Sequence, residues 1–270
     1  MNIARSGYYK WLRRLGIESE KSQKDKYLTS LVRETFDKHK KRYGSIRICN
    51  ELNRNGVNVN VKKVARIMKE NSLVSLHKKR FKVCTTNSKH NNPVADNVIK
   101  RDFSPKTPNA IWVADITYIH TAEGWLYLAT ILDLFSRRVV GYACAEHMEK
   151  SLVLEALDNA LLLRRPIKGL IFHSDRGVQF ACNDFRAAIN SSMFIQSMSR
   201  KGNCWDNAPA ESFFATLKKE LIYENNYATR FHAERDIFEY IVAYYNTIRQ
   251  HSFLGYLAPD EFEKKYAQAA

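Results

Sequence analysis

The pattern of the chain changes at residue 111, and this change constrains the fold more than any other feature. Beyond it the sequence becomes rich in β-branched and aromatic residues, which predicts closely connected strands at 111–119, 125–134 and 138–145. Helical periodicity then alternates with short apolar runs. It predicts helices at 151–165, 183–190, 209–223 and 230–250, and strands at 169–173 and 193–198. Three strands joined this closely favour an antiparallel meander.

This order of elements is that of the ribonuclease H fold. We therefore predict an α/β fold for residues 109–270, with a mixed sheet covered by helices. The 270 residues leave room for a second, smaller domain, and the apolar fraction of 45% excludes wholesale disorder. No apolar run is long enough to span a membrane, so no membrane partner is expected. The five scattered cysteines argue against a disulfide framework and suit a reducing cytoplasm.

The excess of positive over negative charge lies in the first part of the chain. The net charge is +15, yet residues 1–108 hold 26 Lys and Arg against 9 Asp and Glu, whereas residues 109–270 hold 17 against 19. Such an excess indicates a polyanionic partner, and DNA is the natural candidate. Residues 1–74 show helical periodicity and predict a small all-α domain. Residues 75–108 combine basic residues and prolines with little periodicity, which predicts a basic linker.

The helix predicted at about 60–71 has the pattern of a recognition helix. One stripe is apolar and is formed by Val61, Val64, Ala65 and Met68. The other carries the four cations Lys62, Lys63, Arg66 and Lys69. Three helices and a basic linker around this pattern favour a helix-turn-helix-like DNA-binding domain. A solvated basic face is the alternative for this helix taken alone.

Three carboxylates occupy unusual positions in the second part. Asp115 lies inside an otherwise apolar strand, where a carboxylate is costly without a positive partner. Asp175 follows the strand at 169–173, at the end where ligand sites of α/β folds gather. Glu211 opens the helix at 209–223. Taken alone, Asp175 is equally well explained as a turn residue, and Glu211 as a favourable charge at a helix start.

Convergence of these acids would create a metal site. Two carboxylates about 4 Å apart repel by about 4 kcal/mol at an effective dielectric near 20, and Mg²⁺ or Mn²⁺ relieves that repulsion. Three carboxylates can hold two ions for an in-line displacement at phosphorus. Lys218 lies two turns after Glu211 on the same helix face, where it can hold a substrate phosphate. An ordinary exposed lysine is the alternative for Lys218.

These acids and the phrases around them resemble a known family. Asp115, Asp175 and Glu211, with 35 residues between the last two, are similar to the DDE triad of integrase-type transposases. Four phrases in the same order resemble the OrfB transposase of the insertion sequence 3 family. They are Trp-Val-Ala-Asp-Ile-Thr-Tyr-Ile (112–119), His-Ser-Asp-Arg-Gly-Val-Gln-Phe (173–180), Gly-Asn-Cys-Trp-Asp-Asn-Ala-Pro-Ala-Glu-Ser-Phe-Phe (202–214) and Tyr-Asn-Thr-Ile-Arg-Gln-His-Ser-Phe-Leu-Gly-Tyr-Leu-Ala-Pro (245–259).

The resemblance implies a specific activity. The triad would hold two Mg²⁺ or Mn²⁺ ions for cleavage at the ends of an insertion sequence and for transfer of the freed 3′-hydroxyl into target DNA. Lys218 would contact DNA, and the 202–214 phrase would shape the loop before Glu211. The resemblance also implies a homo-oligomer in the synaptic complex, in the bacterial cytoplasm at the nucleoid. Family members commonly act with an upstream-frame subunit or fusion that carries a leucine zipper, and no heptad run occurs in this chain.

Two other functions remain open from the residues themselves. A nuclease of the same fold would cut DNA without joining it and would share the three acids. A non-catalytic DNA-binding regulator would leave Asp115 and the spacing of the acids without a purpose. A nuclease would give nicked ends, whereas a transposase would give joined strands. A non-catalytic regulator would show no metal-dependent chemistry.

Overall fold

A computed structural model describes residues 5–12, 19–76, 92–201 and 203–269. The chain divides into two compact units, Met1–His77 and Lys78–Ala270. Residues 77–91 of the predicted linker lie outside the described residues. Within the described ranges no helix is long and apolar enough to cross a membrane.

The first unit is all-helical, as predicted. Its described helices are α1 (Arg5–Leu12), α2 (Glu20–Lys38), α3 (Ser45–Arg54) and α4 (Val61–Glu70). The last three share a core that includes Val32, Phe36, Ile48, Leu52 and Val64. Side chains cap two of the helix starts: Ser19 Oγ accepts from the Ser22 amide and Asn60 Oδ1 from the Lys63 amide.

The apolar stripe of α4 differs from the prediction. Val64 and Met68 are buried as expected, but the third buried member is Ile67, while Val61 and Ala65 are exposed. Val61 occupies the first position of α4, where the helix has only begun to approach the core. Positions 64, 67 and 68 follow i, i+3, i+4 spacing and form a narrower stripe than the predicted one.

The second unit contains one five-stranded mixed sheet. Its strands are β1 (Ile111–Thr121), β2 (Gly124–Asp133), β3 (Val139–Ala145), β4 (Ile171–Ser174) and β5 (Ile195–Met198), in the spatial order β3-β2-β1-β4-β5. Strands β1, β2 and β3 form the predicted antiparallel meander, and β4 and β5 extend it in parallel from β1. The mixed sheet and its strand order confirm the predicted ribonuclease H-like fold.

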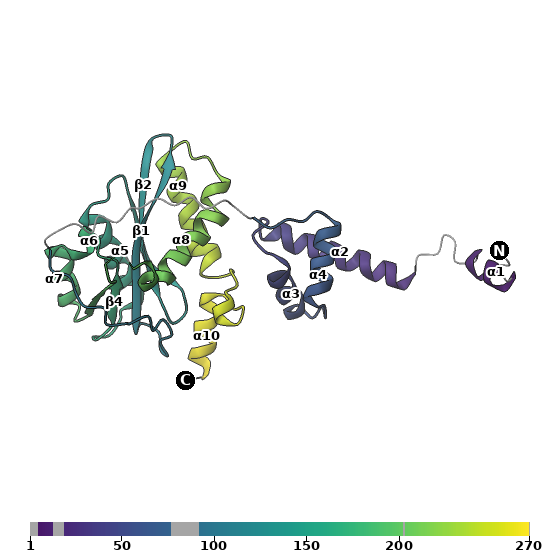
Figure 1. Cartoon of the computed structure of the whole chain (residues 1–270), viewed down its shortest axis with the longest axis horizontal. Helices are drawn as coiled ribbons and strands as arrows, with labels where there is room; N and C mark the ends of the chain where they lie inside the picture. The colour runs from purple at the N-terminus through teal and green to yellow at the C-terminus, as the bar shows by residue number, and fades with distance from the viewer. Residues whose placement is uncertain (1–4, 13–18, 77–91, 202, 270) are drawn as a thin grey trace. The chain divides into compact units, whose positions relative to one another are not determined.

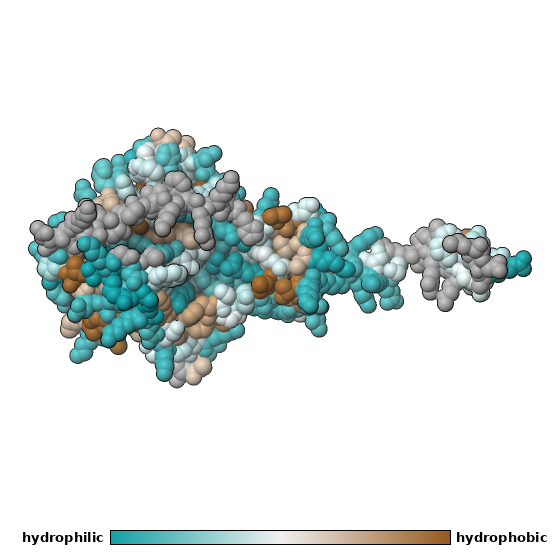
Figure 2. All heavy atoms as spheres, in the orientation of Figure 1, coloured by the Kyte–Doolittle hydropathy of each residue, from teal (hydrophilic) through white to brown (hydrophobic). Residues whose placement is uncertain are grey.

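Helices cover both faces of this sheet (Figure 1). One face packs against α5 (Lys150–Arg164), α6 (Val178–Ala181) and α7 (Asn183–Ser191). The other packs against α8 (Ala208–Glu220), α9 (Arg230–Phe238) and the π-helical segment η3 (Glu239–Tyr245). Short 3-10 turns lie at η1 (Cys204–Asn207), η2 (Ile222–Glu224) and η4 (Ser252–Leu254), before the last helix, α10 (Pro259–Ala269). Hydrophilic residues dominate the visible surface (Figure 2).

The predicted helix at 230–250 is replaced by two shorter segments. The α-helical geometry of α9 ends at Phe238, and a π-helix continues only to Tyr245. The residues beyond it use their side chains for long-range contacts, since Asn246 pairs with Val139 and Arg249 pairs with Glu220. The regular α-helix ends before the residues that make these contacts, and the π-helical segment lies between the two.

Candidate active site

Two of the predicted acids lie next to each other because of the pairing of β1 with β4. The parallel register ends at the pair Ala114 and Ser174, and the following residue on each strand is Asp115 or Asp175. Adjacent strands lie about 4.8 Å apart, so both carboxylates start from neighbouring backbone positions, one within β1 and one directly after the end of β4. The structure thus brings together two acids that are 60 residues apart in the sequence.

The turn after β4 fixes the Asp175 carboxylate. Its Oδ1 accepts a hydrogen bond of 2.9 Å from the Gly177 amide. A Cβ atom at Gly177 would lie 3.0 Å from that oxygen and 3.1 Å from Gln179 Oε1, although the φ of −61° suits any residue. Glycine is therefore required for the close approach of the carboxylate and not for the backbone conformation.

The third acid, Glu211, lies in the first turn of α8 and is exposed. The start of α8 is attached to β1 by Asn207, whose Nδ2 donates to the Ala114 carbonyl oxygen at 3.1 Å. Since Ala114 directly precedes Asp115, this bond places the first turn of α8 at the edge where the two aspartates lie. Glu211 follows Asn207 by about one helical turn.

The charges of Asp175 and Glu211 both act on Asp115. The pKa of Asp115 is raised well above its ordinary value, first by burial of its carboxylate and then by the charges of Asp175 and Glu211. The Ile116 amide, which donates to Asp115 Oδ1 at 2.8 Å, and the charge of Lys218 oppose this shift. The acids therefore repel one another at the sheet edge.

Lys218 belongs to the same edge. Burial lowers the pKa of its ammonium group, and the nearby charge of Asp115 acts against that effect. The Lys218 Nζ atom lies 4.8 Å from the centre of the Tyr118 ring, which provides a cation–π contact. Lys218 is thus a half-buried cation beside the acids, and not the ordinary exposed lysine of the alternative interpretation.

The donor set fits a divalent metal ion. Three carboxylates supply the hard oxygen ligands that Mg²⁺ and Mn²⁺ prefer, and their mutual repulsion is the kind that a cation relieves. Among the residues that the structure describes, no group of three His, Cys, Asp or Glu side chains is arranged to hold a metal ion. The three residue types suit a divalent ion, but their side chains are not arranged as a ligand set in this structure.

The loop before α8 is held by Asp206, which is fully buried. Its carboxylate accepts from Arg101 Nε at 2.8 Å, from Arg200 Nε and Nη2 at 2.9 Å each, and from Asn97 Nδ2 at 2.9 Å. The hydrogen bonds from Arg200 hold the pKa of Asp206 far below its usual range. Arg101 and Asn97 lie in the part of the predicted linker that packs in the second unit. They help to fix the loop that carries Asn207 and leads to Glu211.

A buried ion pair holds the other end of α8. Arg249 Nη2 lies 2.7 Å from Glu220 Oε1, its Nε lies 2.9 Å from Glu220 Oε2, and the Tyr240 hydroxyl donates to Oε2 at 2.8 Å. The sequence phrase at 245–259 gave no role for Arg249, and Glu220 did not stand out among neighbouring charges. Arg249 stands among the polar residues Asn246, Thr247 and Gln250, so no local pattern revealed this pair.

The phrase at 245–259 also protects the edge of the sheet. Asn246 uses both ends of its amide on the backbone of Val139 in the edge strand β3, with two bonds of 3.0 Å. It thereby satisfies backbone groups that an edge strand would otherwise expose. This phrase therefore forms hydrogen bonds to β3.

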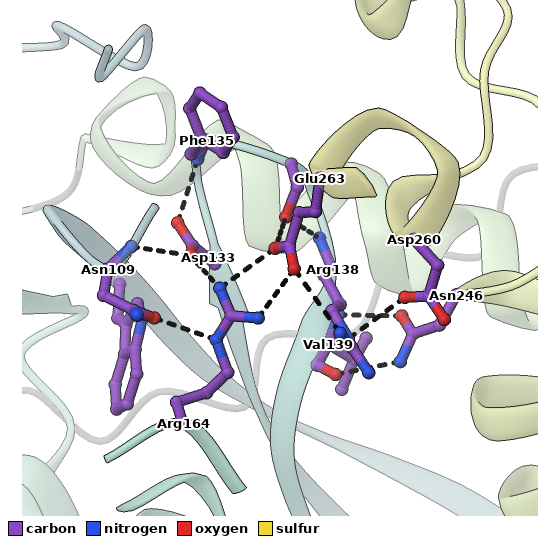
Figure 3. A network of polar contacts seen from close by, with 11 residues as sticks. Asn109, Asp133, Phe135, Arg138, Val139, Arg164, Asn246, Asp260 and Glu263 are labelled. Carbon is purple, nitrogen blue, oxygen red and sulfur yellow. Dashed lines mark hydrogen bonds and ion pairs between the residues drawn. The ribbon is translucent and has the colours of Figure 1, made fainter. Parts of the chain in front are cut away.

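A second polar network fixes the start of β1 (Figure 3). Arg164, at the end of α5, donates to Asp133 Oδ2 at 3.0 Å, to Glu263 Oε2 at 2.7 Å and to Asn109 Oδ1 at 2.9 Å. The Asn109 amide in turn donates to Asp133 Oδ2 at 2.8 Å. One arginine thus joins α5, β2 and α10 to the residue that leads into β1 and its acid at position 115.

In the first unit, the four predicted DNA-contacting cations all lie on α4. Lys63 Nζ is 2.8 Å from Asp25 Oδ1 of α2, and Arg66 Nη2 is 3.4 Å from Asp25 Oδ2. Lys62 and Lys69 are exposed. The side chains of Lys63 and Arg66 keep exposed fractions of 38% and 53%, so the contact with Asp25 leaves them accessible to a polyanion.

Comparison with known proteins gives matches in both units. Residues 105–204 and 194–259 each match an "Integrase core domain" family, and residues 22–81 match the "HTH-like domain" family. The chain is 44% identical over 268 residues to the insertion element IS600 uncharacterized 31 kDa protein of Shigella sonnei, covering 99% of this chain and 97% of that protein. It is 38% identical over 265 residues to transposase InsF for insertion sequence IS3A of Escherichia coli (strain K12), covering 98% and 92%.

A solved structure overlaps the second unit weakly. The HTLV-2 integrase catalytic core domain in complex with magnesium has a TM-score of 0.45 and 17% identity, covering 58% of this chain and 97% of that one. The relationship of the chain to known proteins therefore rests on the sequence matches and not on this overlap.

Proposed function

Because the chain belongs to the insertion sequence 3 family of DDE transposases, which are polynucleotidyl transferases with an integrase core, we propose that its acids direct the cleavage and joining of DNA. Asp115, Asp175 and Glu211 would hold two Mg²⁺ or Mn²⁺ ions. The ions, when bound, would activate the attacking oxygen and stabilise the charge that develops on the phosphate. The observation that carries this proposal is the convergence of the charges of Asp175 and Glu211 on Asp115.

The reaction has two steps at phosphorus. Water attacks a phosphodiester at the end of the element, and the bond to the leaving oxygen breaks to free a 3′-hydroxyl. That hydroxyl then attacks a target phosphodiester, forms a new P–O bond and releases a target oxygen. The Gly177 amide, which donates to Asp175 Oδ1, would orient that carboxylate, and Lys218 would hold a phosphate oxygen beside the acids.

DNA binding is assigned to α4 in the first unit. A shallow groove between α2 and α4 is lined by five cations and two acids, and Lys69 extends the positive charge along α4. The lining residues are Lys21, Lys24, Lys62, Lys63, Arg66, Glu20 and Asp25. The Lys62→Ala/Lys69→Ala variant should reduce the slope of log affinity against log salt by about 2, because two phosphate contacts are lost. Lys168→Ala, at an exposed site in the second unit, is the control. An unchanged slope in the double variant would place the contacts elsewhere.

The acting species would be a homo-oligomer on the element ends and the target, in the bacterial cytoplasm at the nucleoid. An upstream-frame subunit or fusion would supply recognition of the terminal repeats. The presence of HTH-like and integrase core matches in one chain supports DNA as the partner.

The decisive experiment follows DNA products with and without Mg²⁺. The substrates are duplexes that carry the two ends of the element encoding this chain, with a labelled target. Asp115→Asn should abolish cleavage and joining while DNA affinity stays near that of the wild type. Asp158→Asn, at an exposed acid on α5, should remain active and is the matched control. Transfer by Asp115→Asn would refute the proposed site, and nicked ends without joined products would indicate a nuclease.

A further inference from the structure

Trp205 is unusually exposed for a tryptophan. The exposed fraction of its side chain is 69%, higher than that of the other tryptophans in the described part of the chain. An indole that faces water has its ring available for contact with a partner. Trp205 lies in η1, directly before the buried Asp206.

The backbone around this indole is well anchored. Asn203 Oδ1 accepts from the Trp205 amide at 3.2 Å and from Arg101 Nη2 at 3.0 Å. On the other side, Asp206 and Asn207 are both buried, and Asn207 is bonded to the Ala114 carbonyl oxygen beside Asp115. The exposed ring is therefore presented by a fixed turn at the rim of the acidic edge.

Cations accompany the ring. Arg101 and Arg200 both bind the carboxylate of Asp206, and their side chains keep exposed fractions of 43% and 55%. Two guanidinium groups share one carboxylate, so the turn carries an excess positive charge next to an exposed aromatic face. An aromatic platform with arginines beside it is the combination that binds unpaired nucleotides, with the base on the ring and the backbone phosphate on the cations.

Building on the proposed function, we propose that Trp205 stacks on the base of a nucleotide next to the reacting phosphodiester, and that this nucleotide is unpaired when it binds. Arg101 and Arg200 hold the phosphate of the same nucleotide. Stacking requires no particular base, because every base offers a π-face, so Trp205 contributes affinity and position without reading sequence.

The test uses the full chain and an end-containing duplex whose last nucleotides are unpaired, with 2-aminopurine beside the bond to be cut. Binding should quench the 2-aminopurine fluorescence with the wild type and with Trp205→Phe, and not with Trp205→Ala. Affinity for this DNA should fall about five-fold or more in Trp205→Ala, whereas affinity for a fully paired duplex of equal length should be unchanged. Phe231→Ala, at a side chain that is also 69% exposed, is the matched control.

The outcomes separate this inference from the proposed function. Equal quenching by the wild type and Trp205→Ala, or an equal loss of affinity for paired and unpaired DNA, would overturn the stacking. An equal loss in Phe231→Ala would do the same, because it would show a general effect of removing a surface aromatic. Quenching that depends on Trp205, in a wild-type protein that neither cuts nor joins DNA, would support the stacking and contradict the proposed chemistry.

Discussion

Replacing Glu220 with glutamine should destabilise the second unit far more than replacing a surface acid. The side chains of Glu220 and Arg249 are only 4% and 6% exposed. Glutamine keeps an acceptor for the Tyr240 hydroxyl but removes the charge opposite the guanidinium, whose Nη2 now lies 2.7 Å from the carboxylate. A buried arginine without a counter-charge costs about 3–5 kcal/mol in the free energy of unfolding.

Urea unfolding of the full chain, followed by tryptophan fluorescence, measures this loss. A double-mutant cycle with Arg249→Met isolates the pair, and the double variant should be at least about 2 kcal/mol more stable than the sum of the two single effects predicts. Glu261→Gln is the control, because Glu261 forms a partly exposed ion pair with Lys265 at 3.5 Å. That change should cost less than about 1 kcal/mol.

Additive effects in the cycle would refute the reasoning, because they would show that the two charges do not stabilise each other. A loss in Glu220→Gln no larger than that in Glu261→Gln would refute it as well. Since Glu220 ends the helix whose first turn carries Glu211, partial unfolding here should also reduce DNA cleavage at urea concentrations below the main transition.

Three further predictions concern the site. Gly177→Ala should slow cleavage about ten-fold with little loss of stability, because the new Cβ would lie 3.0 Å from Asp175 Oδ1. Gly44→Ala, whose new Cβ would have its nearest contact at 3.6 Å, is the control and should cut DNA at the wild-type rate. Equal cleavage rates for the two variants would refute this prediction. Burial lowers the pKa of His173 from 6.5 to about 4, so the unfolded chain binds more protons and stability should fall as pH drops from about 6.5 toward 4; His173→Asn should flatten that slope in unfolding curves. Burial and neighbouring carboxylates raise the pKa of Asp115, so Mg²⁺ binding should release protons and strengthen with rising pH. Calorimetry in buffers of different ionisation enthalpy measures the released protons. Mg²⁺ binding that is independent of pH would contradict this prediction.

The elements of the sheet were predictable because their patterns are local. The β-branched runs, the helical periodicity of α5 and the order of elements lead to the observed strand order. The end of α9 was not predictable in this way. Its geometry depends on Asn246 and Arg249, whose partners Val139 and Glu220 lie far away in the sequence.

Asp115 was singled out in the sequence for a different reason. A carboxylate inside an apolar strand violates the local pattern, and such violations mark functional sites. The phrase at 202–214 pointed to the loop that Asp206 holds, whereas Arg164 resembles an ordinary charged residue until the chain is folded. Ile67 was missed on α4 because periodicity alone does not tell which turn of a helix reaches the core.

The contacts of the last part of the chain have a consequence for protein synthesis. Asn246, Arg249 and Glu263 close the edge of the sheet, hold the end of α8 and fix the start of β1, yet all three follow the last acid, Glu211, in the sequence. A nascent chain that has just passed Glu211 already contains every acid, but it lacks the framework that orients them. A product that ends shortly after Glu211 would therefore contain all three acids and lack these contacts.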